Sequence, residues 1–160
     1  FLKKVNGKNQ GSIHVRINAD TGQLLAFDSY VNNPTTKPTY PLKVERDNAK
    51  EIALKFIANM AASYYKQIKF NDDYGVQILP PLTGEVRHTL RFDRMVDGIP
   101  FVGNYIDLEV DSEGHILRYS LQWDDTIKFP EVNTQLSLEQ ANEKLRAAAN
   151  PILNYIIPYN

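Results

Sequence analysis

Three histidines are the first residues to weigh, because histidine is the usual general base and metal ligand near neutral pH. His14, His88 and His115 lie far apart in the sequence, and no pair has the i, i+4 spacing of a helical zinc site. We expect each of them to be an ordinary core or surface histidine. The chain has no cysteine, which excludes thiol nucleophiles, disulfides and thiolate metal sites.

Clusters of oxygen atoms are the second kind of candidate. Asn18, Asp20 and Gly22 resemble the start of a calcium loop, but Gln23 and the leucines that follow supply no bidentate glutamate. A plain turn is therefore favoured. Paired carboxylates occur at residues 72–73 and 124–125 within polar connecting segments, where we expect solvated charges. One hypothesis is an enzyme in which His88 or His115 acts together with such loop carboxylates. The expectation that we favour is a protein that is not an enzyme and has no cofactor.

The charge of the chain is nearly balanced. It contains 18 Lys and Arg against 19 Asp and Glu in 160 residues, which gives a net charge of −1. We therefore expect no nucleic-acid partner. The apolar runs are only a few residues long, far below the ~20 needed to span a bilayer, so this segment is not expected to insert into a membrane.

The elements that must position these residues are organised as a repeat. Residues 13–27 match residues 106–119 with one gap, at an offset of 93 and then 92 residues. The offset of 92 persists from Ala49 and Glu51 to Ala141 and Glu143. We infer a tandem unit of about 92 residues that is read as a helix followed by three strands.

Helical periodicity is clearest after residue 45. Apolar residues recur at three- and four-residue spacing from Ala49 to Tyr64, which predicts one amphipathic helix that begins near Glu45 or Asp47. Ser137 and Gln140 have the spacing of a capping box and predict a second helix over residues 137–150.

Strands are predicted by alternation of apolar and polar residues. It occurs over residues 86–93, 106–110 and 117–123, with glycine turns at Asp97-Gly98 and Glu113-Gly114. Each strand has one apolar face, so the predicted fold is α+β, with the amphipathic helix packed on an antiparallel β-meander. The aromatic content includes nine tyrosines, which could line a ligand groove or simply pack in the strands.

Three segments follow from the repeat. Residues 1–40 would be the C-terminal sheet part of one copy, residues 41–130 a complete copy, and residues 131–160 the N-terminal helix of a following copy. Residues 32–41 and 124–134 are rich in Pro, Thr, Asn and Asp and are predicted to be linkers.

The segment from Leu90 to Tyr119 resembles the YcdB/YcdC repeat of Gram-positive bacteria, a branch of the PepSY-like domains. The resemblance rests on the Asp-Gly-Ile-Pro-Phe run at 97–101, the Val-Asp-Ser-Glu-Gly hairpin at 110–114 and the Trp-Asp-Asp segment at 123–125. The segment is more distantly similar to the propeptide modules of thermolysin-like peptidases. In the earlier copy the Gly-Ile-Pro turn is replaced by Gly-Lys-Asn at 7–9.

This resemblance implies an extracytoplasmic protein, secreted or attached to the cell surface, whose modules bind or regulate a peptidase or a peptide. It carries no catalytic residue and no metal ligand. A structural spacer in a larger cell-envelope protein is the alternative. The candidate binding residues are on the polar sides of the strands, where cross-strand charge pairing is the competing interpretation; they are Arg87, Arg91, Asp107, Glu109 and Arg118.

Overall fold

The computed structural model describes residues 2–31, 40–76, 86–131 and 136–149, which fall into two compact units. The first unit spans residues 1–127 and the second residues 128–160. The structure does not test where one repeat copy ends and the next begins, so those boundaries and the repeat length stay predictions. Residues 32–39 and 132–134 of the predicted linkers lie outside the described residues.

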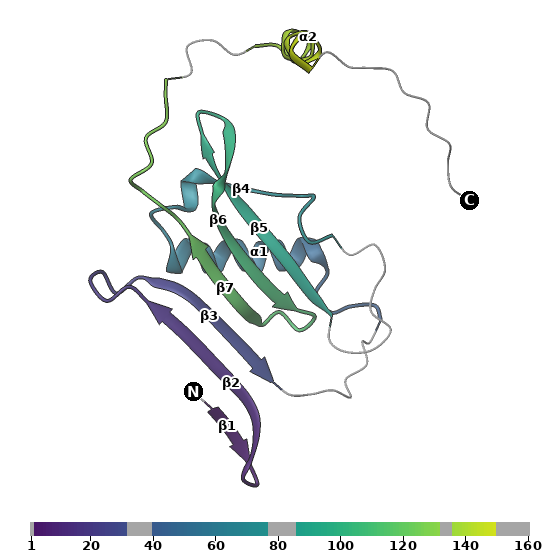
Figure 1. Ribbon diagram of the computed structural model, residues 1–160. Helices are drawn as coiled ribbons and strands as arrows, with labels where there is room; N and C mark the ends of the chain where they lie inside the picture. The colour runs from purple at the N-terminus through teal and green to yellow at the C-terminus, as the bar shows by residue number, and fades with distance from the viewer. Residues whose placement is uncertain (1, 32–39, 77–85, 132–135, 150–160) are drawn as a thin grey trace. The chain divides into compact units, whose positions relative to one another are not determined.

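The described residues of the first unit form one antiparallel sheet of seven strands in the order β1-β2-β3-β7-β6-β5-β4 (Figure 1). The strands of residues 1–40 and those of residues 41–130, which were predicted as parts of two repeat copies, lie in this one sheet. The strands are β1 Leu2–Val5, β2 Lys8–Ile17, β3 Leu24–Val31, β4 Ile68–Phe70, β5 Arg87–Val96, β6 Ile99–Asp111 and β7 Ile116–Gln122. The predicted α+β fold with an antiparallel meander is confirmed, and the meander is β5-β6-β7.

The core lies on one face of this meander. Leu90 and Phe92 of β5 and Ile106, Leu108 and Val110 of β6 are all fully buried. They alternate with polar residues, as the period of two requires. We call the face that carries them the inner face and the opposite face the outer face.

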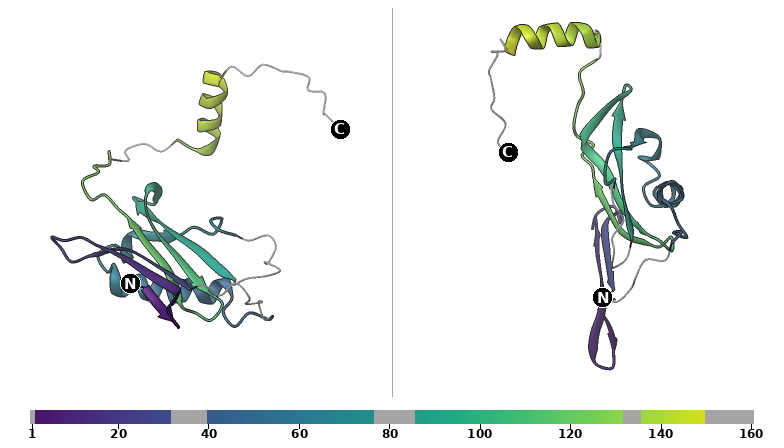
Figure 2. Two further views of the ribbon diagram at one scale, coloured as in Figure 1. Left: turned by 60° about the horizontal axis from the view of Figure 1, so that its bottom comes forward. Right: turned by 90° about the vertical axis from the view of Figure 1, so that its right-hand side faces the viewer.

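Helix α1 (Arg46–Met60) covers the inner face of the meander, as Figure 2 shows. Ala49, Ala53 and Ile57 point into the core and have no exposed surface. The small side chains of Ala49 and Ala53 let the helix pack closely on the sheet. The predicted stripe is slightly too long, because the helix ends at Met60; Tyr64 lies beyond it in a turn and is still buried.

The strands β1, β2 and β3, which we call the open unit, repeat the arrangement of β5, β6 and β7, which we call the helix-covered unit. The two turns that join β1 to β2 and β5 to β6 have nearly the same φ values, +50° and +75° at Asn6-Gly7 and +50° and +79° at Asp97-Gly98. The register shifts at Ile17 in β2 and at the equivalent Val110 in β6. Residues 26–28 of β3 pair with residues 118–120 of β7 and join the open unit to the helix-covered unit edge to edge within one sheet.

The second unit contains helix α2 (Leu138–Ala149). Its start is the predicted capping box, in which the Ser137 N–H donates to Gln140 Oε1 at 3.0 Å and the Gln140 N–H donates to Ser137 Oγ at 3.2 Å. All residues from 136 to 149 are exposed. No helix among the described residues has the length and apolar character that a membrane span requires.

Candidate functional site

The five predicted binding residues, which are Arg87, Arg91, Asp107, Glu109 and Arg118, all lie on the outer face. The strand register places Arg91 opposite Asp107, and Glu109 opposite Arg118. This face carries polar side chains because α1 occupies only the other side of the sheet.

Arg91 is held most firmly. Its guanidinium donates two hydrogen bonds to Asp107, both at 2.7 Å. Its Cζ atom lies 4.0 Å from the centre of the Tyr74 ring and 3.8 Å from that of Tyr105, so the cation is placed between two aromatic faces. The hydrogen bonds to Asp107 raise the pKa of Arg91, against the opposing effect of burial. Arg91 Nη2 also donates to the Tyr74 hydroxyl at 3.3 Å, so three of the five N–H groups of Arg91 are engaged.

Glu109 is shared between two arginines. Its carboxylate oxygens lie 3.4 Å from Arg87 Nη1 and 3.4 Å from Arg118 Nη1. These contacts are longer than those of Arg91, and the Arg118 side chain is 53% exposed. Each of the five residues therefore takes part in at least one cross-strand charge pair. A binding role for them stays a prediction.

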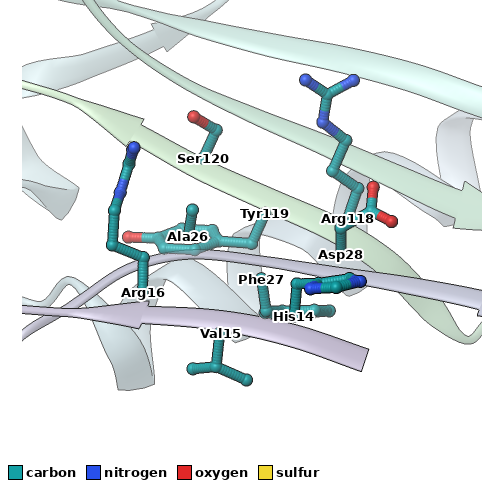
Figure 3. A pocket seen from close by; sticks show the side chains of 9 residues that line it. All are labelled: His14, Val15, Arg16, Ala26, Phe27, Asp28, Arg118, Tyr119 and Ser120. Atoms are coloured by element: carbon teal, nitrogen blue, oxygen red, sulfur yellow. The ribbon is translucent and has the colours of Figure 1, made fainter. Parts of the chain in front are cut away.

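A groove of about 390 Å³ lies where the open unit meets the helix-covered unit, at the β3-β7 junction. Ala26 and Ser120 are register partners at its centre, and their short side chains leave room between longer neighbours. Figure 3 shows Arg16, Arg118 and Ser120 pointing to the same side of the sheet, whereas Val15 points to the other. The groove therefore opens on the outer face. Its lining is His14, Val15 and Arg16 of β2, Ala26, Phe27 and Asp28 of β3, and Arg118, Tyr119 and Ser120 of β7.

The groove has an excess of positive charge. Among the described lining residues, Arg16 and Arg118 supply two guanidinium groups and Asp28 supplies one carboxylate. Asp28 is the register partner of both His14 and Arg118. Arginine donates and aspartate accepts hydrogen bonds, so the groove could hold a ligand that offers both carbonyl or carboxylate oxygens and N–H groups.

Sequence reasoning found only Arg118 of this groove. It missed His14 as a groove residue, and it missed Arg16, Ala26, Asp28 and Ser120, because the β3-β7 pairing joins strands that are about 90 residues apart. The signal that was available is the alternation itself, since residues 14, 16, 26 and 28 are the non-core positions of their strands.

The other two histidines are tied to local structure. His88 Nε2 lies 2.9 Å from the carbonyl oxygen of Val44, which precedes α1. His115 Nδ1 lies 2.9 Å from Asp111 Oδ2, and Asp111 also accepts the backbone N–H groups of Glu113 and His115 in the β6-β7 turn. Both histidines thus stabilise connections near the ends of strands.

The candidate oxygen clusters form turns. Asn18 Oδ1 accepts the backbone N–H groups of Asp20 and Thr21, so the segment that resembles a calcium loop is an Asx turn. Asp124 accepts from Thr126 at 2.6 Å and 2.8 Å, and these hydrogen bonds lower its pKa. Within residues 2–31, 40–76, 86–131 and 136–149, no group of three or more His, Asp or Glu side chains is arranged to hold a metal ion.

Comparison with protein families gives a match to one family model, the YcdB, YcdC repeated domain, over residues 3–123. This range contains most of the chain and both units of the sheet. The chain belongs to this family. No curated protein and no solved structure shows significant similarity to the chain.

The motifs that carry the resemblance to the YcdB, YcdC repeated domain have structural roles here. Asp97-Gly98 forms the β5-β6 turn, where both residues have positive φ. At the same end of the meander, just after β7, Asp125 accepts hydrogen bonds from Trp123 Nε1 at 3.0 Å and from the Tyr64 hydroxyl at 2.9 Å. The rings of Tyr64 and Trp123 are 4.4 Å apart. The Trp-Asp-Asp segment therefore fastens the end of the sheet to the turn that follows α1.

Proposed function

We propose that this YcdB, YcdC repeated domain is a non-catalytic, extracytoplasmic binding module that holds an extended peptide segment of a partner protein, and that the partner is a peptidase. The observation that supports this proposal is the groove at the β3-β7 junction. It is a concave and positively charged site on the outer face, which α1 leaves free. The peptidase and the extracytoplasmic location rest on the resemblance alone.

An acidic peptide fits the groove best. Arg16 and Arg118 lie on either side of the small residues Ala26 and Ser120 and can donate to carbonyl and carboxylate oxygens. Asp28 can accept an N–H group of the same peptide. Long-range attraction between a basic groove and an acidic segment would speed association and weaken as salt is added.

The test uses the purified chain immobilised on a biosensor. The analytes are a thermolysin-type peptidase and peptides of equal length with acidic or neutral side chains. We expect binding of the peptidase and of the acidic peptide. In Arg118→Ala the affinity should fall at least about tenfold, because a hydrogen bond to a charged group contributes about 1.5–3 kcal/mol.

A matched pair of variants locates the site. Ser120→Phe fills the centre of the groove, whereas Gln122→Phe places the same ring two residues away on the same face of β7, outside the lining. We expect loss of binding only in Ser120→Phe. Equal affinity in both variants would show that the ligand binds elsewhere. Failure of the unmodified chain to bind either analyte would contradict the proposal and favour the structural spacer.

A further inference from the structure

The inner face of the open unit carries an exposed apolar surface. Ile13, Val15 and Ile17 of β2 are 42%, 56% and 57% exposed, and Val31 at the end of β3 is 53% exposed. We call these four residues the apolar stripe. A row of exposed aliphatic side chains on one face of a sheet is typical of a surface that binds another element.

The helix-covered unit shows which kind of element that would be. Ile106, Leu108 and Val110 of β6 stand 93 residues after Ile13, Val15 and Ile17, and they have no exposed surface. Helix α1 buries that face of the sheet. Strands β2 and β6 have matching apolar positions, turns and register shifts. The apolar stripe therefore has the arrangement of apolar side chains that packs against an amphipathic helix in the helix-covered unit.

Helix α2 is a helix of that kind. Ala141 and Glu143 match Ala49 and Glu51 at the start of α1. Leu138, Ala141 and Leu145 follow helical spacing and form one apolar face, on which Leu138 is 79% and Leu145 65% exposed. A 12-residue helix gains most of its stability from packing such a face against another element.

We propose that the apolar stripe binds helix α2 of a second copy of this chain. Each copy carries an exposed sheet face of the type that α1 covers, and a helix of the type that covers it. The contact joins two different surfaces, so it is heterologous, and copies add head to tail. This self-association uses the inner face of the open unit, whereas the proposed peptide groove opens on the outer face; Val15 belongs to the apolar stripe and to the lining of the groove.

Analytical ultracentrifugation of the full chain tests the proposal. We expect the weight-average mass to rise with concentration beyond that of a dimer. Val15→Lys places a charge in the middle of the apolar stripe, and Leu145→Lys places a charge on the apolar face of α2. Each change should prevent the contact, so each variant alone should remain a monomer. An equimolar mixture should form a dimer and nothing larger, because each variant retains the half that the other lacks and only one contact is possible.

Two lysine substitutions serve as controls. Ser12→Lys lies on the outer face of β2, and Glu143→Lys lies on the side of α2 away from Leu138 and Leu145; both should associate like the unmodified chain. Circular dichroism checks that every variant folds. A chain that stays monomeric at all concentrations, association that survives in either single lysine variant, or a mixture that stays monomeric would each overturn the proposal.

Discussion

The open unit and the helix-covered unit are built alike and packed differently. They share the order of strands, the positive φ values of the first turn and a register shift near the end of the middle strand. Yet Ile17 is 57% exposed while the equivalent Val110 is fully buried. The difference shows that alternation along a strand decides which face is apolar, whereas a helix decides whether that face is buried.

The largest difference is expected for apolar truncations. Ile106→Ala should lower the free energy of unfolding by about 2–5 kcal/mol, because it leaves a cavity under α1. Ile17→Ala removes the same atoms from an exposed face and should lower it by less than about 1 kcal/mol. Chemical denaturation of both variants measures the difference. Equal losses would contradict the distinction between the two units.

The second prediction concerns alkaline pH. Burial raises the pKa of Tyr119 in β7 from 10.0 to about 12. Below pH 10 the phenol is protonated in both states; between pH 10 and 12 only the unfolded state loses the proton, so stability falls as pH rises. The loss approaches roughly 3 kcal/mol, since one pKa unit corresponds to about 1.4 kcal/mol.

Tyr119→Phe isolates this effect. Phe27, the residue that matches Tyr119 in the open unit and stacks on its ring at 6.3 Å, has no hydroxyl, so Phe is sterically accepted at such a position. Denaturation at pH 9 and pH 12 should show a smaller loss of stability in Tyr119→Phe than in the unmodified chain. An equal loss in the two proteins would show that other groups dominate alkaline unfolding.

The third prediction compares two ion pairs on the outer face. A double-mutant cycle on Arg91 and Asp107 should give a coupling free energy of about 1–3 kcal/mol, because two short charged hydrogen bonds lie in a half-buried site. The same cycle on Arg118 and Glu109 should give about 0–1 kcal/mol, because the distance between their charged atoms is longer and the Arg118 side chain is more exposed. If the coupling free energy of Arg118 and Glu109 equalled that of Arg91 and Asp107, the expected difference between the two ion pairs would be wrong.

The smallest difference is expected at the turns. Gly7 and Gly98 have φ of +75° and +79°, and a Cβ atom at either would meet nothing within 4 Å. Gly7→Ala and Gly98→Ala should therefore each lower stability by about 1–2 kcal/mol, through backbone strain alone. Differential scanning calorimetry that shows a much larger effect at one turn would reveal contacts that the two units do not share.

Much of the fold follows from patterns within each segment. Spacing of Ala49, Ala53 and Ile57 predicted α1, alternation predicted the strands of the meander, and Ser137 with Gln140 predicted the start of α2. These features depend on neighbours a few residues away, which is why a single sequence contains them. The short strand β4 was missed because three residues are too few to show a period.

The groove could not be predicted in the same way. It exists because Ala26 of β3 lies beside Ser120 of β7, and no local pattern indicates which strands from different copies become neighbours. Likewise, the stacking of Tyr74 and Tyr105 on Arg91 depends on the path of the segment after β4. The polar faces were predictable from the alternation; the contacts across them required the three-dimensional structure.

Native-state hydrogen exchange at low protein concentration tests most directly whether a covering helix separates the two units. The account predicts that hydrogen-bonded amides of the β6-β7 ladder exchange at least about 100-fold more slowly than those of the β2-β3 ladder, a difference of about 2.8 kcal/mol in opening free energy. Ile106→Ala should narrow the difference. Equal protection of the two ladders in the unmodified chain would contradict the account.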